Sequence, residues 1–279
     1  MACSAPISGW LSRRVNPSGR RSVVFRLRDG YVDKPVQLPC GRCLGCRADQ
    51  SLMWSIRAYH ESSLHERNCF VTLTYADEHL PADGRIVKAD LQNFFKRLRW
   101  GIAPAKLRYL ACGEYGELTR RPHYHALIFG QDFLHDRIPI SGRLYTSPTV
   151  SEAWPYGHIS IGSVTMSSCC YVAGYVVKKI NDTDTFMLAS RRPGIGHDWI
   201  DRYYDDLRRT RSVVIEGREY PIPARYLDWH TDALAEVKLS RRRHMERYNK
   251  DVDPMERRRR DDAKHVNRSS ALSRRSETL

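Results

Sequence analysis

Two strand-like segments joined by a short charged turn constrain the fold of this chain more than any other feature. KLRYLACGEYG occupies residues 106–116, and RRPHYHALIFG occupies residues 120–130. Such runs, separated by a few turn residues, are typical of a β-hairpin. Successive side chains of a strand point to opposite faces, so His123 and His125 share one face and Tyr124 lies on the other. We expect an α+β fold, with a mostly antiparallel sheet flanked by helices and this hairpin near its centre.

A carboxylate could complete a site beside the two histidines. Glu114 lies nine positions before His123, and Glu117 lies six positions before it, nearer to the turn. Across a hairpin, one of these carboxylates is expected opposite the histidines on the same face. Two imidazoles and one carboxylate make a three-ligand site for a divalent cation and leave positions open, as a catalytic metal requires. The residues alone leave Glu114 and Glu117 open, and an exposed strand end with polar side chains would show the same pattern.

The segment SSCCYVAGYVVKKI, residues 167–180, is expected to form a helix that begins after its two serines, because serine is a favoured N-cap. Tyr171 and Tyr175 lie four residues apart, and Lys178 lies three further on, so all three share one helix face. A phenol can act as a nucleophile when its proton is removed or its target is polarised. Tyrosines at this spacing are also common in protein cores.

The composition indicates a polyanionic partner. Lysine and arginine number 46 against 32 acidic residues, which gives a formal net charge of +14. This balance favours nucleic acid, although a basic surface that serves only solubility would look the same. From Arg241 onward, 13 basic residues stand against 7 acidic ones, which predicts a DNA-binding arm or a solvated helix. There is no signal-peptide pattern and no run of about 18 apolar residues, so we expect a cytosolic protein without a membrane partner.

Three cysteines form a second candidate site. Cys40, Cys43 and Cys46 have the spacing C-x-x-C-x-x-C, which can bind a structural Zn²⁺ if a fourth ligand is present. The alternative is a glycine-rich turn with unbound thiols. Candidates for the fourth ligand are Cys3, Cys69, His60 and His65.

Several of these segments together resemble a known family. FVTLTY (residues 70–75), GEYG followed by RPHYHALIFG, and YVAGYVVKK occur in this order. They resemble the three motifs of HUH endonucleases, specifically the replication initiators of small circular single-stranded DNA bacteriophages, the microviruses and most of all the gokushovirus-like group. LPCGRCLGCR, WPYG and RRPGIG also resemble that group. The resemblance covers about residues 35–200 and implies an RRM-like or palm-like core.

The resemblance implies a chemistry for the site. Mg²⁺ or Mn²⁺ would be held by His123, His125 and an acidic residue, most simply Glu114, and would polarise the scissile phosphate. Tyr175 or Tyr171 would attack, which leaves a 5′-phosphotyrosine link and a free 3′-hydroxyl. Lys178, at the same helix, would stabilise the phenolate or the phosphate. Two tyrosines would permit two successive transfers, as rolling-circle replication needs.

Partners and location follow from the same resemblance. The expected partners are single-stranded DNA at the viral origin, the double-stranded replicative form, and a host helicase and polymerase in the bacterial cytoplasm. A host helicase is expected because no P-loop motif is present. Alternatives are a relaxase or transposase of the same superfamily, or a non-catalytic nucleic-acid-binding protein stabilised by zinc. Basic side chains expected to contact DNA are Arg120, Arg121, Lys179, Arg191 and Arg192.

The chain is expected to divide into three parts. Residues 1–38 would form an N-terminal extension, residues 39–215 the nickase domain with the cysteine segment, and residues 216–279 a basic, partly disordered C-terminal region. Within the middle part, residues 130–165 are expected to be irregular because proline and glycine recur there. His158, beside a glycine in this stretch, is expected to be a polar surface residue.

Overall fold

The structure is a computed structural model in which the chain forms two compact units. One unit comprises residues 1–49 together with 247–279, and the other comprises residues 50–246. The predicted boundaries at residues 38 and 215 stay a prediction about folding units. No helix in the described part of the chain is both long enough and apolar enough to cross a membrane. The structure describes residues 3–17, 19, 21–116, 119–178, 184–241, 243, 253, 255–256, 259–260, 262–263 and 266–267.

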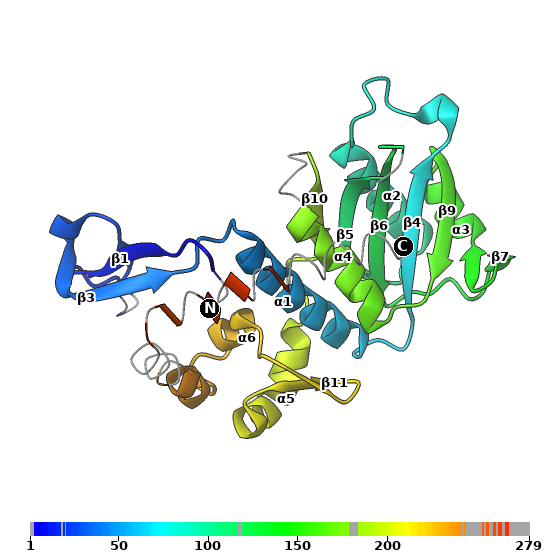
Figure 1. The fold of residues 1–279 in the computed structure, drawn as a ribbon. Coiled ribbons are helices and arrows are strands. Elements are labelled where there is room, and N and C mark those ends of the chain that lie inside the picture. The colour runs from blue at the N-terminus through cyan, green and yellow to red at the C-terminus, as the bar shows by residue number, and fades with distance from the viewer. Residues whose placement is uncertain are drawn as a thin grey trace. The chain divides into compact units, whose positions relative to one another are not determined.

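A seven-stranded antiparallel sheet forms the centre of the larger unit (Figure 1). Its strands lie in the order β10-β5-β6-β4-β9-β8-β7, so the hairpin β5–β6 is flanked on both sides. This sheet and its helices confirm the predicted α+β fold. The strands are β4 (Asn68–Tyr75), β5 (Arg108–Tyr115), β6 (Pro122–Phe129), β7 (Ile138–Ser141), β8 (Leu144–Thr146), β9 (Gly157–Gly162) and β10 (Phe186–Ala189).

Helices cover both faces of this sheet (Figure 1). On one face, α2 buries a stripe that includes Phe94 at helical spacing, and this stripe packs in one apolar cluster with Leu73 and Tyr124 of the sheet. On the other face, α4 shares a buried cluster with Leu110 and Leu127. The helices are α1 (Leu44–Ser62), α2 (Lys88–Gly101), α3 (Pro148–Ala153) and α4 (Met166–Lys178), with a 3-10 turn η2 (Asp77–His79).

The register of the hairpin follows the period-2 pattern of its sequence. Glu114 of β5 lies opposite His123 of β6, and Cys112 lies opposite His125. Tyr124 projects from the other face, where its hydroxyl donates to the carbonyl of Val87 at 2.8 Å. The hydroxyl also accepts the N–H of that residue at 3.0 Å. The polar and apolar faces of the hairpin are therefore separated as the alternation predicts.

The last elements of the larger unit form a third buried cluster. Ile56 from α1 packs there with Ile200, Ile215 and Tyr226. The predicted C-terminal region therefore begins in folded structure, because residues 216–241 include a strand and a helix of this cluster; most of the arginine-rich end lies outside the described residues. These elements are α5 (His197–Thr210), β11 (Val213–Ile215), β12 (Arg218–Tyr220) and α6 (Ala224–Trp229).

The smaller unit contains a three-stranded antiparallel sheet in the order β2-β1-β3. Ile7 of β1 lies opposite Leu38 of β3. Among the described residues, none of the three buried apolar clusters of the protein includes a residue of this unit. The elements are β1 (Ile7–Ser12), β2 (Val23–Val24), a 3-10 turn η1 (Leu27–Asp29) and β3 (Gly30–Leu38).

Two local expectations were wrong. Residues 130–165 are not irregular, because β7, β8, α3 and β9 lie there. α4 begins at Met166 and not after the serines, because the hydroxyl of Thr165 accepts the N–H of Ser168 at 3.1 Å. The hydroxyl of Ser168 in turn accepts the N–H of Thr165 at 2.8 Å. This reciprocal pair is a capping box, and it places the N-cap two residues before the serines.

A candidate metal centre beside two tyrosines

One carboxylate oxygen is the meeting point of the predicted metal ligands. Glu114 Oε1 lies 2.8 Å from Nε2 of His123 and 3.0 Å from Nε2 of His125. Ligand atoms of the three residues all lie within 4.8 Å of one another. The side chains of Glu114 and His125 are 4% and 7% exposed, while that of His123 is 17% exposed. The cluster is therefore mostly shielded from water and opens on the His123 side.

The outer nitrogens of the two imidazoles determine what their inner nitrogens can do. Nδ1 of His123 lies 3.1 Å from the carbonyl oxygen of Arg121, which only accepts, so this nitrogen carries a proton. Nδ1 of His125 lies 3.0 Å from the hydroxyl of Thr72. A neutral ring protonated at Nδ1 presents a lone pair at Nε2, and a lone pair facing a carboxylate requires a proton or a cation between them. Such outer partners are typical of histidines that bind metals through Nε2.

The carboxyl of Glu114 is ionised at neutral pH. Burial opposes ionisation, but the hydrogen bonds with His123 and His125 outweigh it and lower the pKa of this carboxyl to about 2. The site thus offers one negative oxygen and two ring nitrogens. This donor set fits Mn²⁺ or Mg²⁺ with coordination positions left open.

Both predicted tyrosines reach the same carboxylate oxygen from α4. The hydroxyl of Tyr175 donates a short hydrogen bond to Glu114 Oε1. The hydroxyl of Tyr171 lies 3.3 Å from that oxygen and 3.4 Å from Nε2 of His125. Burial raises the pKa of Tyr171 to about 12 and raises that of Tyr175 further. Both phenols are therefore protonated at neutral pH, and their nucleophilic use requires removal of that proton.

The register of the sheet places three more polar residues on this face, which the sequence reasoning did not use. Thr74 of β4 lies opposite His123 on one side and opposite His158 of β9 on the other. Thr72 lies opposite His125 in the next row. Cross-strand partners project from the same face, so the row extends from Glu114 to the exposed His158. The alternation of FVTLTY was the available signal for the two threonines.

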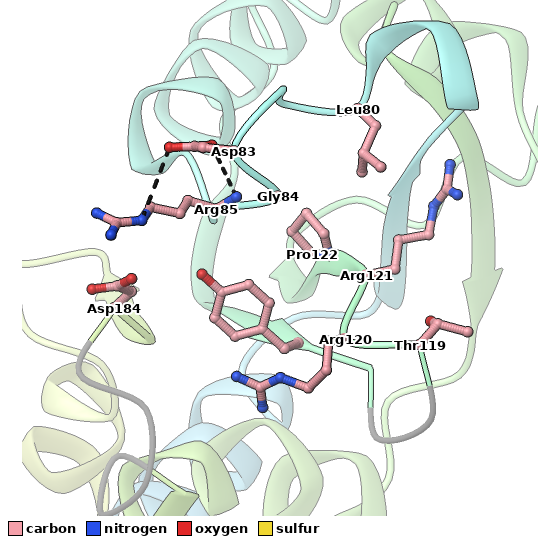
Figure 2. A pocket seen from close by; sticks show the side chains of 10 residues that line it. Leu80, Asp83, Gly84, Arg85, Thr119, Arg120, Arg121, Pro122 and Asp184 are labelled. Atoms are coloured by element: carbon pink, nitrogen blue, oxygen red, sulfur yellow. Dashed lines mark hydrogen bonds and ion pairs between the residues drawn. The ribbon is translucent and has the colours of Figure 1, made fainter.

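A cavity of about 610 Å³ opens at the turn of the hairpin (Figure 2). It adjoins the metal ligands, because Tyr115 follows Glu114 and Pro122 precedes His123 along the strands. The guanidinium of Arg121 donates to Asp77 at 2.6 Å and to the carbonyl of Tyr75 at 2.7 Å. The residues that line the cavity are Leu80, Asp83, Gly84, Arg85, Tyr115, Thr119, Arg120, Arg121, Pro122 and Asp184.

The other predicted DNA contacts are not gathered at this site. Arg191 and Arg192 lie exposed in the loop between β10 and α5. Lys178 ends α4, but its side chain is not among the described ones, and Lys179 lies outside the described residues. Glu117, the alternative ligand, also lies outside them. Their predicted roles stay predictions.

The predicted cysteine site lies in the smaller unit. Cys40, Cys43 and Cys46 come together there with Cys3. Of the other candidates for the fourth position, Cys69 is buried in the sheet of the larger unit, and His60 stacks on Trp199 there.

Comparison with known proteins identifies the family. The family model of the replication-associated protein ORF2 matches residues 68–180, which include the three metal-ligand candidates and both tyrosines. No solved structure matches the chain significantly. The replication-associated protein VP4 of Bdellovibrio phage phiMH2K is 38% identical over 211 residues, which cover 69% of this chain and 67% of that protein.

Two further relatives carry similar names. The replication-associated protein ORF2 of Spiroplasma virus 4 is 40% identical over 196 residues, which cover 64% of this chain and 61% of that protein. The replication-associated protein ORF4 of Chlamydia phage 1 is 29% identical over 212 residues, with shares of 68% and 53%. The match thus spans less than two thirds of these last two relatives. The chain belongs to the family of phage replication-associated proteins.

Proposed function

We propose that this chain is a metal-dependent replication initiator that nicks DNA at a viral origin and rejoins it after rolling-circle synthesis. The observation that carries the proposal is the convergence of two imidazoles and two phenols on one carboxylate oxygen, Glu114 Oε1. A protein that only binds DNA does not need nucleophiles beside a candidate metal centre. The family membership supports a role in replication.

His123, His125 and Glu114 would hold the divalent cation. When bound, Mg²⁺ or Mn²⁺ would neutralise the charge that develops on the scissile phosphate. The imidazoles are held in a fixed orientation by Thr72 and by the carbonyl of Arg121. Preorganised ligands of this kind keep the geometry of the site constant through the reaction.

The phenol of Tyr175 or Tyr171 would attack the phosphorus of one phosphodiester. The phenol loses its proton, a bond forms between the tyrosine oxygen and phosphorus, and the bond from phosphorus to the 3′ oxygen breaks. The 3′ oxygen takes up a proton and becomes a hydroxyl, which can prime a polymerase. One phosphodiester replaces another, so the reverse attack by a 3′-hydroxyl rejoins the strand without an energy-supplying cofactor.

The pair of tyrosines suits two successive transfers. Their ring centroids lie 5.3 Å apart, and each phenol contacts Glu114. One tyrosine can therefore keep the first 5′ end while the other cuts the regenerated origin. Lys178 ends the same helix, and we retain it as the residue that would stabilise the phenolate or the phosphate.

The DNA would cross the open edge of the site near the hairpin turn. Arg85, Arg120 and Arg121 line the cavity there (Figure 2), and arginines bind phosphates well. Single-stranded DNA at the origin is the proposed substrate, within the double-stranded replicative form. Unwinding and synthesis would come from a host helicase and polymerase, in the cytoplasm of the bacterial host.

The test is an adduct assay. The protein is incubated with single-stranded origin DNA and Mn²⁺, and detergent-resistant adducts are measured on gels. We expect adducts from the wild-type chain and from Tyr145→Phe, a matched control whose ring lies on β8 away from the site. The double variant Tyr171→Phe/Tyr175→Phe and the variant His125→Ala should form none. An adduct from the double variant would contradict the proposal.

A further inference from the structure

Four thiols of the smaller unit form a compact cluster. The sulfurs of Cys40 and Cys46 lie 4.0 Å apart, and those of Cys43 and Cys3 lie 3.9 Å apart. All four sulfurs lie within 4.8 Å of one another. Four sulfurs placed ~2.3 Å from a tetrahedral Zn²⁺ are separated by about 3.8 Å. The observed separations match the edges of such a tetrahedron.

The fold brings the fourth thiol to the other three. Cys3 lies 37 residues before Cys40, so no local spacing links them. The antiparallel pairing of β1 with β3 sets Ile7 opposite Leu38 and thereby returns the start of the chain to the cysteine segment. The backbone N–H of Cys40 donates to the sulfur of Cys3 at 3.2 Å. Cys3 is therefore a member of the cluster through two independent contacts.

Backbone donors point at the other sulfurs as well. The N–H of Cys43 donates to the sulfur of Cys40 at 3.3 Å, and the N–H of Cys46 donates to that of Cys43 at 3.5 Å. Hydrogen bonds to sulfur favour the thiolate form, which is the form that binds metals. The C-x-x-C-x-x-C turn is thus folded so that its amides face the sulfurs.

The smaller unit also lacks the usual source of stability. Phe25, Leu27 and Val32 are 60%, 48% and 62% exposed, although each is a large apolar residue. A module of this size without an apolar core normally depends on disulfides or a metal. Disulfides are not formed, because all four cysteines are free and their sulfurs stand far beyond a bond of about 2 Å.

We infer that Cys3, Cys40, Cys43 and Cys46 bind one structural Zn²⁺ as a closed tetrathiolate site, which holds the N-terminal β-module folded. The site has no open position, so the metal serves structure and not catalysis. Binding of the metal is coupled to folding of the module, since the four ligands come from both ends of its sheet. This metal is separate from the cation expected at Glu114.

The first measurement is the metal content of the full-length chain purified without chelators. We expect one equivalent of zinc by mass spectrometry of the elements. Exchange for Co²⁺ should give strong visible bands of tetrahedral coordination and a near-ultraviolet band of thiolate-to-cobalt charge transfer. A chain without zinc, a chain that holds iron instead, or an octahedral Co²⁺ spectrum would overturn the inference.

The second measurement separates Cys3 from other thiols. Cys3→Ser should lose most of the zinc and the four-thiolate spectrum, whereas the matched control Cys170→Ser, in α4, should keep both. Full zinc content with an unchanged spectrum in Cys3→Ser would overturn the role of Cys3. If a variant does not fold, the wild-type chain decides the matter. Titration with a mercurial should release its zinc as four thiolates react, and chelation should expose residues 3–49 to protease; zinc release after reaction of fewer sulfurs, or unchanged protease resistance, would contradict the inference.

Discussion

Thr72 is predicted to control metal affinity without touching the metal. Its hydroxyl lies 3.0 Å from Nδ1 of His125, and the side chain of that histidine is 7% exposed, so water cannot readily replace the lost partner. Thr72→Val keeps the shape of the side chain and removes the hydroxyl. Loss of such an outer partner typically weakens metal binding 10- to 100-fold, or ~1.4 to ~2.7 kcal/mol.

The assay is a titration with Mn²⁺, followed by calorimetry and in parallel by adduct formation. The dissociation constant of Thr72→Val should rise by about 10- to 100-fold, and saturating Mn²⁺ should restore adduct formation, because the ligands themselves remain. Thr72→Ser keeps the hydroxyl and should bind as the wild-type chain does. Thr74→Val is the matched control, since the hydroxyl of Thr74 donates instead to the carbonyl of His158, at 3.4 Å, on an exposed part of the face. Unchanged Mn²⁺ affinity in Thr72→Val would refute the reasoning.

Three further predictions concern stability, each measured by urea unfolding. Glu61 is 1% exposed and binds Arg108 and the N–H of Gly196, so Glu61→Ala should cost about 3 to 5 kcal/mol; a loss below about 1 kcal/mol would contradict this. Tyr124→Phe should cost about 1 to 3 kcal/mol, because it leaves a backbone amide without its buried partner; an unchanged midpoint would count against it. Burial lowers the pKa of His60 to about 3, so protonation favours the unfolded chain. Stability should therefore fall as the pH drops from about 6.5 to about 3, by up to ~1.4 kcal/mol per pH unit, and His60→Gln should flatten the slope; an equal slope in both chains would refute this cause.

The parts of the fold that depend on local pattern could be predicted from the sequence. Alternation along β6 and a short turn were enough to place Glu114 opposite His123, because hairpin register is a local property. The four-residue spacing of Tyr171 and Tyr175 was likewise enough to place both phenols on one face of α4.

The parts that depend on distant segments could not. β9 joins the sheet beside β4, but prolines and glycines around it concealed its alternation. Trp154 is held by the carbonyl of Thr74, 80 residues earlier in the chain, at 3.0 Å. The fourth thiol of the cysteine cluster was open among several candidates, since only the pairing of β1 with β3 brings Cys3 to that position. Long-range pairing of this kind leaves little trace in any short window of sequence.

The central claim is that Glu114, His123 and His125 hold a cation within reach of two phenols. Anomalous diffraction from crystals of the chain soaked with Mn²⁺ tests it most directly. We predict a manganese peak bonded to Nε2 of both histidines and to the carboxylate, with the hydroxyls of Tyr171 and Tyr175 facing it. A peak elsewhere with this triad empty, or phenols turned away from the ion, would contradict the claim.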